Sequence, residues 1–334
     1  MAQEIRQADI AKKLGVSVVA VSRALSGKEG VGPALREEIL ETARTMGYTL
    51  KSGREAQMCT STVGILIAEE YLSVENSFFS AMQLHLNHAL TDHGAASLLK
   101  IIPPDSTPGE HLIPKSADGL VVVGKLSPHY LRLLEALDLP LLYLDFYTPD
   151  SRAVSVLADG YLGAWELTRY LLSVGHQNIG YLGSIQSDAN AQDRYFGYCK
   201  ALAEAGITPH PDWIIPNRAK RGFFETYRLP EDLPTAFVCD CDQSASLFTR
   251  DLIRQGYRVP ADISVTGFYN HVFSTLTSPT LTTYSINMAE MGRRAATAII
   301  DLIRGKHVPR RILISGEPVL RESVTKPNSA FQRT

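Results

Sequence analysis

From position 9 to position 27 the chain reads DIAKKLGVSVVAVSRALSG, and this stretch decides the fold of the first part of the protein. Gly15 divides it into two short helical patterns, because apolar residues recur four positions apart on each side. The first pattern holds Ile10 and Leu14, and the second holds Val21 and Leu25. We therefore predict two short helices joined by a tight turn at Gly15.

A third helix is predicted from Pro33 to Gly47, because proline favours the first turn of a helix and glycine favours its end. Ser17 is a suitable N-cap for the second helix. Apolar residues of the third helix face the same small core: Leu35, Ile39 and Met46. Three short helices with a tight turn between the first two form a helix-turn-helix unit.

The second predicted helix has two different faces when its residues are placed about 100° apart. Val21 and Leu25 lie on one face, and Val19, Ser22 and Arg23 lie on the other. Arginine can pair with guanine, serine with a phosphate or base edge, and valine with a thymine methyl, so the outer face suits the major groove of DNA. The alternative, in which both valines are core residues and Arg23 is merely solvated, is disfavoured because Val19 cannot share a face with Val21.

Length and charge agree with a small basic head on a larger body. A chain of 334 residues with 45% apolar and 20% charged residues is ordinary for a soluble protein of two or three domains. Residues 1–54 hold nine Lys or Arg and six Asp or Glu, whereas the remainder holds 24 basic and 29 acidic residues. A basic head suits contact with phosphates, although ordinary charge fluctuation remains the alternative.

The four cysteines and the N-terminus exclude several protein classes. No C-x-x-C pair is present, so a zinc finger or a thioredoxin-like site is unsupported, and we expect no metal and no cofactor. The first residues lack the apolar core of a signal peptide, and no run approaches the roughly 18 apolar residues of a membrane span. We expect a cytoplasmic protein without a membrane partner.

From residue 63 onward, short apolar segments alternate with helical patterns, which predicts an α/β architecture of parallel sheets flanked by helices. The predicted strands are 63–67, 97–101, 120–123, 141–144, 179–182, 236–239, 263–266 and 281–284. The predicted helices are 79–91, 128–136, 162–174, 192–205, 243–254 and 288–304. In such sheets a ligand lies beyond the carboxyl ends of the strands.

The first fifty residues closely resemble the DNA-binding headpiece of the lac repressor (LacI/GalR) family. The resemblance is carried by 9–17, 21–27, 31–33 and 46–48. It implies a transcription regulator that binds double-stranded operator DNA as a homodimer or a tetramer. By this resemblance the operator-contacting positions are Ser17, Val18, Val19, Ser22, Arg23 and Ser26.

The linker departs from the family pattern. In the family this stretch forms a hinge helix that inserts a leucine into the minor groove. Here residues 51–62 are polar, the expected leucine is missing, and Met58 or Ala56 would have to substitute. The sequence therefore leaves open whether a hinge helix forms.

The rest of the chain resembles the periplasmic-binding-protein-like core of the same family, through 76–79, 175–183, 193–198, 259–268 and 278–283. The resemblance implies two lobes that hold a small-molecule effector, by default a sugar, in the cleft between them. The matching effector positions are Phe78, Phe79, Asp145, Phe146, Arg194, Asp242, Tyr269 and Asn270. His176 is expected to be structural.

The aromatic residues, Asp145 and Arg194 each have a chemical role that suits effector binding and an alternative role in the fold. An aromatic face can stack on a ring, a carboxylate at Asp145 can accept two sugar hydroxyls, and Arg194 offers a fork of donors. The alternatives are plain core packing for the phenylalanines and an ion pair across the cleft for Asp145 and Arg194. Tyr269 stands where the family has aspartate, so the effector differs from a simple hexose, or Asp240, Asp242 or Asn270 takes over.

We accordingly divide the chain into a helix-turn-helix domain at 1–50, a linker at 51–62, a two-lobed effector-binding and dimerisation domain at 63–325, and a tail at 326–334. We predict a regulator of a sugar-utilisation operon, most simply a repressor, with activation as the variant that sequence does not separate. The rivals are a solute-binding protein for transport and an α/β enzyme with a phosphate or metal site.

The enzyme rival depends on two weak patterns. Residues 119–126 nearly match a phosphate-binding loop, but Leu126 replaces the required Ser or Thr, and the segment between the glycines is an apolar strand pattern. His85, His88 and Asp92 lie along one helix stripe that is more simply a solvated edge. We therefore expect a non-catalytic protein.

Overall fold

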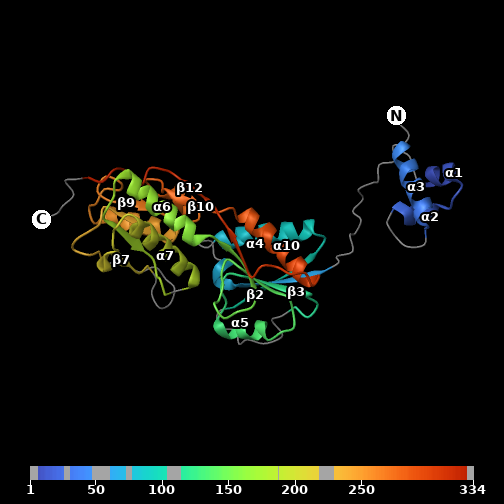
Figure 1. The fold of residues 1–334 in the computed structure, drawn as a ribbon, viewed down its shortest axis with the longest axis horizontal. Coiled ribbons are helices and arrows are strands. Elements are labelled where there is room, and N and C mark those ends of the chain that lie inside the picture. Colours follow the sequence, from blue (N-terminus) through green and yellow to red (C-terminus); the bar gives the residue numbers. More distant parts are fainter. Residues whose placement is uncertain are drawn as a thin grey trace. The chain divides into compact units, whose positions relative to one another are not determined.

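The computed structural model divides the chain into two compact units, 1–58 and 59–334, which are described separately (Figure 1). The structure describes residues 7–25, 31–46, 61–72, 77–103, 114–186, 188–217 and 229–328. Ser26, most of the predicted linker and the end of the predicted tail lie outside these residues.

The first unit contains the three predicted helices, α1 (Gln7–Leu14), α2 (Val18–Leu25) and α3 (Pro33–Thr45). The turn after α1 requires a left-handed backbone, and Gly15 provides it with φ +66°. Apolar residues from all three helices form one small core: Ile10, Ala11, Val21, Ala24, Ile39 and Ala43. The helix-turn-helix prediction is therefore confirmed.

The first lobe of the second unit is built on a six-stranded parallel sheet of order β11-β5-β4-β3-β1-β2. The strands are β1 (Thr62–Ala68), β2 (Ala96–Ile102), β3 (Gly119–Val123), β4 (Leu141–Leu144), β5 (Val154–Ala158) and β11 (Arg311–Ile314). Helices α4 (Ser77–Asp92) and α10 (Met288–Ile303) cover one face, and α5 (Pro128–Glu135) covers the other (Figure 1). A sheet covered on both faces explains why its strands read as continuous apolar runs.

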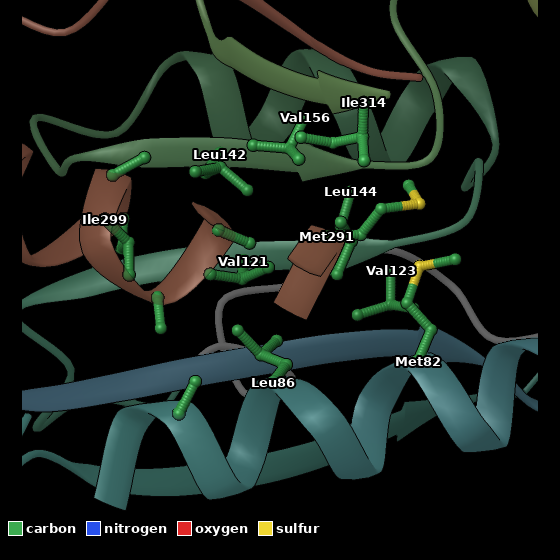
Figure 2. Close-up of a cluster of buried hydrophobic side chains, with 14 of the residues drawn as sticks. Met82, Leu86, Val121, Val123, Leu142, Leu144, Val156, Met291, Ile299 and Ile314 are labelled. Atoms are coloured by element: carbon green, nitrogen blue, oxygen red, sulfur yellow. The ribbon is translucent and has the colours of Figure 1, made fainter. Parts of the chain in front are cut away.

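The main core of this lobe lies between the sheet and the helix pair α4 and α10. Figure 2 shows Met82 and Leu86 of α4 and Met291 of α10 directed toward strand residues such as Val121 and Leu144. The two helices approach closely at Gly292, where a Cβ would lie 2.7 Å from the backbone of His85. These two helices are more than 190 residues apart in sequence, so the lobe is completed only late in the chain.

The second lobe has a four-stranded parallel sheet of order β7-β6-β8-β9. Its strands are β6 (Ile179–Leu182), β7 (Ile214–Ile215), β8 (Ala236–Cys239) and β9 (Ser264–Thr266). Helices α6 (Gly160–Val174) and α7 (Ala189–Glu204) cover one face, and α8 (Asp242–Arg254) covers the other. The remaining elements are 3₁₀ turns at Glu69–Leu72 and Pro211–Trp213, the short helix α9 (Phe273–Leu276), and the antiparallel pair β10 (Thr283–Ser285) and β12 (Glu317–Val319).

The chain passes between the two lobes three times: after β5, between β10 and α10, and between β11 and β12. Neither lobe is therefore a continuous stretch of sequence. The carboxyl ends of β4 and β6 both lead into loops that meet between the lobes, which is where parallel α/β sheets place their ligands.

Most predicted elements are confirmed within a few residues, but four strands were missed: β5, β7, β11 and β12. The segment predicted as a strand at 281–284 is found at Thr283–Ser285, and it pairs antiparallel with β12 instead of joining a parallel sheet. The region that resembles a phosphate-binding loop is the buried strand β3, as its apolar sequence suggests.

Candidate functional site

Helix α2 exposes one face and buries the other. Val18 and Val19 are 47% and 60% exposed, whereas Val21 is fully buried. Ser22 and Arg23 are also exposed. The outer face therefore carries the cation, the hydroxyl and the apolar Val19 that the helical wheel predicts, and Val18 adds a second apolar side chain.

The start of α2 is fixed by Ser17. Its hydroxyl accepts a hydrogen bond of 3.1 Å from the amide of Ala20, which makes it the N-cap of the helix. Val18 and Val19 lie in the first turn, the part of a recognition helix that meets base edges. Ser26, the sixth predicted DNA-contacting residue, lies outside the described residues.

A second group of predicted residues meets between the lobes of the second unit. Asp145 directly follows β4, Arg194 lies on α7, and Tyr269 follows β9. Asp145 and Arg194 are buried, with only 6% and 5% of their surfaces exposed, and Tyr269 is partly buried. Arg194 donates a hydrogen bond of 2.8 Å from its terminal nitrogen to the Tyr269 hydroxyl.

The backbone is strained at this place. Asp145, Tyr269 and Asn270 have φ values of +65°, +93° and +55°, and they are the non-glycine residues with positive φ in the described part of the chain. Such conformations cost on the order of 1–3 kcal/mol each and concentrate at functional sites. The strain at Tyr269 is especially informative, because large side chains rarely adopt it.

Several buried polar atoms here have no hydrogen-bond partner among the described residues: Asp145 Oδ1, Arg194 Nε and Tyr181 Oη. The Tyr181 hydroxyl belongs to the same place, because the charges of Asp240 and Arg194 both act on it. Burying an unpaired polar group is costly, so atoms of this kind indicate a place built to hold a polar ligand.

Burial controls the ionisation of the two carboxyl groups nearby. Loss of hydration raises the pKa of Asp145 to about 7, against the opposing attraction of Arg194. Loss of hydration also raises the pKa of Asp242 to about 7, although its hydrogen bonds from Thr283 and His271 act in the other direction.

Aromatic rings line the first-lobe side of the site. The rings of Phe78 and Tyr269 lie 4.5 Å apart between their centroids, and those of Tyr71 and Phe79 lie 4.2 Å apart. Phe146 does not belong to this group. It packs in the core on the α5 side of the first sheet, stacked on Tyr143 at 4.4 Å, which gives it a structural role.

Two other predicted effector residues are engaged within the second lobe. Asp242 accepts hydrogen bonds of 2.6 Å from the Thr283 hydroxyl and 2.6 Å from the His271 amide, one on each carboxylate oxygen. The Asn270 carbonyl oxygen accepts a hydrogen bond of 2.6 Å from Arg321. Both side chains hold the loop that carries Tyr269, and their polar atoms already have partners.

Sequence reasoning missed the contacts that join the lobes beside this site. On α7, Asn190 donates a hydrogen bond of 2.6 Å to the backbone oxygen of Asp145. Asp193 accepts a hydrogen bond of 3.3 Å from the Tyr147 hydroxyl and lies 3.3 Å from Arg311. Asp193 lies in the stretch 193–198 that carries the family resemblance, but no motif indicates these contacts, because they depend on the way the lobes meet.

The alternatives raised by the sequence differ in how the geometry bears on them. Phe78 lies in the buried core of the first lobe, which supports the core-packing alternative for this residue. His176 bridges the Thr235 hydroxyl and the Thr325 carbonyl at 2.8 Å each, so its predicted structural role is confirmed. Within the described ranges, no three His, Cys, Asp or Glu side chains are placed to bind a metal ion. Among the helices of the same ranges, none combines the length and apolar character needed to cross a membrane.

Comparisons with known protein families match both units. Residues 8–50 match the family model for bacterial regulatory proteins of the lacI family, and residues 168–324 match a periplasmic binding protein-like domain. The two matches together cover more than half of the chain.

Curated relatives match along nearly their whole length. The chain is 28% identical to the HTH-type transcriptional repressor PurR of Aliivibrio salmonicida, over 95% of this chain and 98% of that protein. It is also 28% identical to the ribose operon repressor of Haemophilus influenzae, over 95% of this chain and 97% of that protein. These full-length matches favour a regulator over the solute-binding and enzyme alternatives.

Solved structures share the fold. A complex of the transcriptional regulator CelR with cellobiose has a TM-score of 0.68 at 22% identity, and covers 96% of this chain and 99% of its own. A lac repressor dimer bound to operator and the anti-inducer ONPF has a TM-score of 0.65 at 22% identity, and covers 97% of this chain and all of its own.

Proposed function

We propose that this chain, which belongs to the lacI family of bacterial regulatory proteins, represses a sugar-utilisation operon under the control of a small-molecule effector. Binding of DNA as a transcription regulator is the property of the family. The observation that carries the proposal is the outer face of α2, where Val19 and Arg23 are exposed on a folded three-helix unit.

We assign operator contact to Ser17, Val18, Val19, Ser22, Arg23 and Ser26. Arg23 is suited to guanine or phosphate, and the two valines are suited to thymine methyls. Because a dimer reads two half-sites related by its two-fold axis, we propose a homodimer on a pseudo-palindromic operator. Such a protein acts where the DNA is, in the cytoplasm.

We assign effector binding to the site between the lobes, with Asp145, Arg194, Tyr181 and Phe78 as its main groups. Asp145 accepts from hydroxyls, Arg194 and Tyr181 donate to oxygens, and Phe78 offers an aromatic face. The unpaired polar atoms support this assignment. Relatives named for ribose and cellobiose make sugars the first class to test.

The effector controls DNA binding only to the extent that it prefers one arrangement of the lobes over another. Coupling of this kind is reciprocal, so operator DNA must change effector affinity by the same factor. A regulator of this type therefore has two linked binding activities, which can be measured separately.

The test begins with the purified full-length chain. Operator sequence is selected from random duplex DNA, and effector is sought by thermal shift against ribose, cellobiose and their phosphates, since a ligand that binds only the folded state raises Tm. We expect a selected palindrome and at least one sugar that changes its affinity. Selection of no sequence by the wild type, when Arg23→Ala gives the same outcome, would overturn the proposal.

A further inference from the structure

Tyr269 belongs to the second lobe, but its ring is packed against the core of the first. The ring lies 4.5 Å from that of Phe78 on α4 and 5.0 Å from that of Phe268 in its own lobe, measured between centroids. The partly buried side chain of Tyr269 also packs on the main core of the first lobe. One side chain therefore spans the space between the lobes.

The hydroxyl of Tyr269 accepts a hydrogen bond from Arg194, the charged donor of the site. The terminal nitrogen of Arg194 donates to it at 2.8 Å, and the guanidinium carbon lies 5.4 Å from the centroid of the Tyr269 ring. An aromatic face on Phe78 and an oxygen on Arg194 are the two contacts expected of a bound ligand. Tyr269 makes both of them.

The backbone of Tyr269 is held in place for this purpose. Its φ of +93° is unfavourable for a tyrosine, and the conformation is maintained by its amide, which donates at 2.8 Å to the Tyr284 carbonyl. The next residue is fixed as well, because Arg321 donates to the Asn270 side chain at 2.6 Å. A relaxed backbone would not direct the ring toward Phe78.

We propose that Tyr269 is an internal ligand of the site between the lobes: its ring and hydroxyl fill the place of a bound molecule, so the lobes close on it without effector. An effector of this protein acts by displacing Tyr269 from Arg194 and Phe78. This inference rests on the proposed effector site. It also limits the effector to molecules that replace both contacts, namely a planar or ring-shaped compound carrying an oxygen acceptor.

The first test removes only the hydroxyl. Hydrogen exchange is measured on the full-length chain and on Tyr269→Phe, over the first turns of α4 and α7. Because a hydrogen bond to a charged group contributes roughly 1.5–3 kcal/mol, we expect exchange there to become at least about tenfold faster. Unchanged exchange in both segments would overturn the proposal.

A matched control is Tyr143→Phe. Tyr143 is also buried, and its hydroxyl donates at 2.6 Å to Glu135, but that bond lies within the first lobe. Its loss should lower the global stability without accelerating exchange at the start of α7. Equal acceleration in both variants would show general destabilisation and would overturn the role assigned to Tyr269.

The second test replaces the side chain by its free equivalent. Tyr269→Gly removes the ring and relieves the unfavourable backbone, and p-cresol is the excised side chain as a small molecule. We expect p-cresol to raise the Tm of Tyr269→Gly and to leave that of the wild type unchanged. An equal rise in the wild type would show that Tyr269 does not fill the site.

Failure of this inference and failure of the proposed function are distinguishable. A sugar that raises the Tm of the wild type, lost in Arg194→Ala, would support the effector site whatever p-cresol does. If Tyr269→Gly does not fold, the exchange data on Tyr269→Phe decide the inference alone.

Discussion

The outer face of α2 and the site between the lobes, the two binding surfaces that we propose, are built in opposite ways. On α2 the side chains are exposed, come from eight consecutive residues, and have an unstrained helical backbone. Between the lobes the side chains are buried or partly buried, come from distant parts of the chain, and include three residues with a left-handed backbone. A long polyanion is met by a surface, whereas a small molecule must be enclosed to exclude water, and the two designs follow from that difference.

The largest effect is expected from the core of the headpiece. Ile10→Ala should destabilise the three-helix unit by about 2–5 kcal/mol, because Ile10 is fully buried, and operator binding should be lost with the fold. NMR of the full chain shows whether residues 1–58 stay folded, and circular dichroism during thermal unfolding measures the loss of stability. Val19→Ala, at an exposed position, should keep the unit folded; if both variants unfold it equally, the two-faced description of α2 is wrong.

The next largest effect concerns Arg194. Arg194→Ala should weaken effector binding by about a hundredfold and abolish the response, because it removes the buried donor and the positive charge beside Asp145. Operator affinity without effector is measured by gel shift and should remain. Arg169→Ala, an exposed arginine of the same lobe stacked on Trp165, is the matched control and should respond normally.

On the outer face of α2, Arg23→Ala should weaken operator binding by roughly 1–3 kcal/mol and leave effector binding intact. Fluorescence anisotropy at several salt concentrations tells a base contact from a phosphate contact, because only loss of a phosphate contact lowers the salt slope by about one. Arg132→Ala, exposed on α5, controls for a change in net charge. Equal operator affinity of Arg23→Ala and wild type would remove Arg23 from the interface.

Burial of Asp145 should make stability depend on pH. The folded carboxyl, with its pKa raised to about 7, keeps its proton after the unfolded one has lost it near 3.8, so its contribution is present at low pH and is lost as the pH rises through 7. Between pH 6 and pH 8 the loss amounts to about 1 kcal/mol. Urea unfolding of Asp145→Asn should show a smaller loss than the wild type, with the remainder due to Asp242, whose pKa is also raised to about 7. An identical pH profile in the variant would show that Asp145 is already ionised at pH 6.

The smallest effect is expected at His176, which has a structural role in the second lobe. Desolvation lowers its pKa below 6.5, so protonation favours the unfolded state, and stability should fall as the pH drops below 6.5. Unfolding of the wild type and His176→Gln at pH 7.5 and 5.5 measures this difference. A larger loss in the variant than in the wild type on acidification would contradict the assignment.

The sequence predicts the α2 surface almost completely, because helical periodicity places Val19 and Val21 on different faces without reference to the rest of the chain. It also predicts the parallel strands whose two faces are buried, such as β3 and β6. It does not predict β5 and β11, because Ser155 interrupts the apolar pattern of β5 and β11 begins with Arg311 on an exposed edge.

The site between the lobes is predicted only in part, for a physical reason. Family resemblance predicts Asp145, Arg194 and Tyr269, which the structure brings together, and also Phe146, which packs in the core. Tyr181 and Asn190 were missed, since burial of a hydroxyl and a contact across the lobes depend on tertiary packing. The left-handed backbone at Tyr269 has no local sequence signal, because that conformation is normally reserved for glycine or asparagine.

The three passages of the chain between the lobes have a consequence for biosynthesis. The parallel sheet of the second lobe is complete once β9 ends at Thr266, but the first lobe still lacks α10 and the edge strand β11, which ends at Ile314. A ribosome therefore releases the material for the second lobe before it releases the last pieces of the first. On the nascent first lobe, the apolar surface that α10 will cover stays exposed until the final segment of translation, and surface of this kind is prone to aggregation.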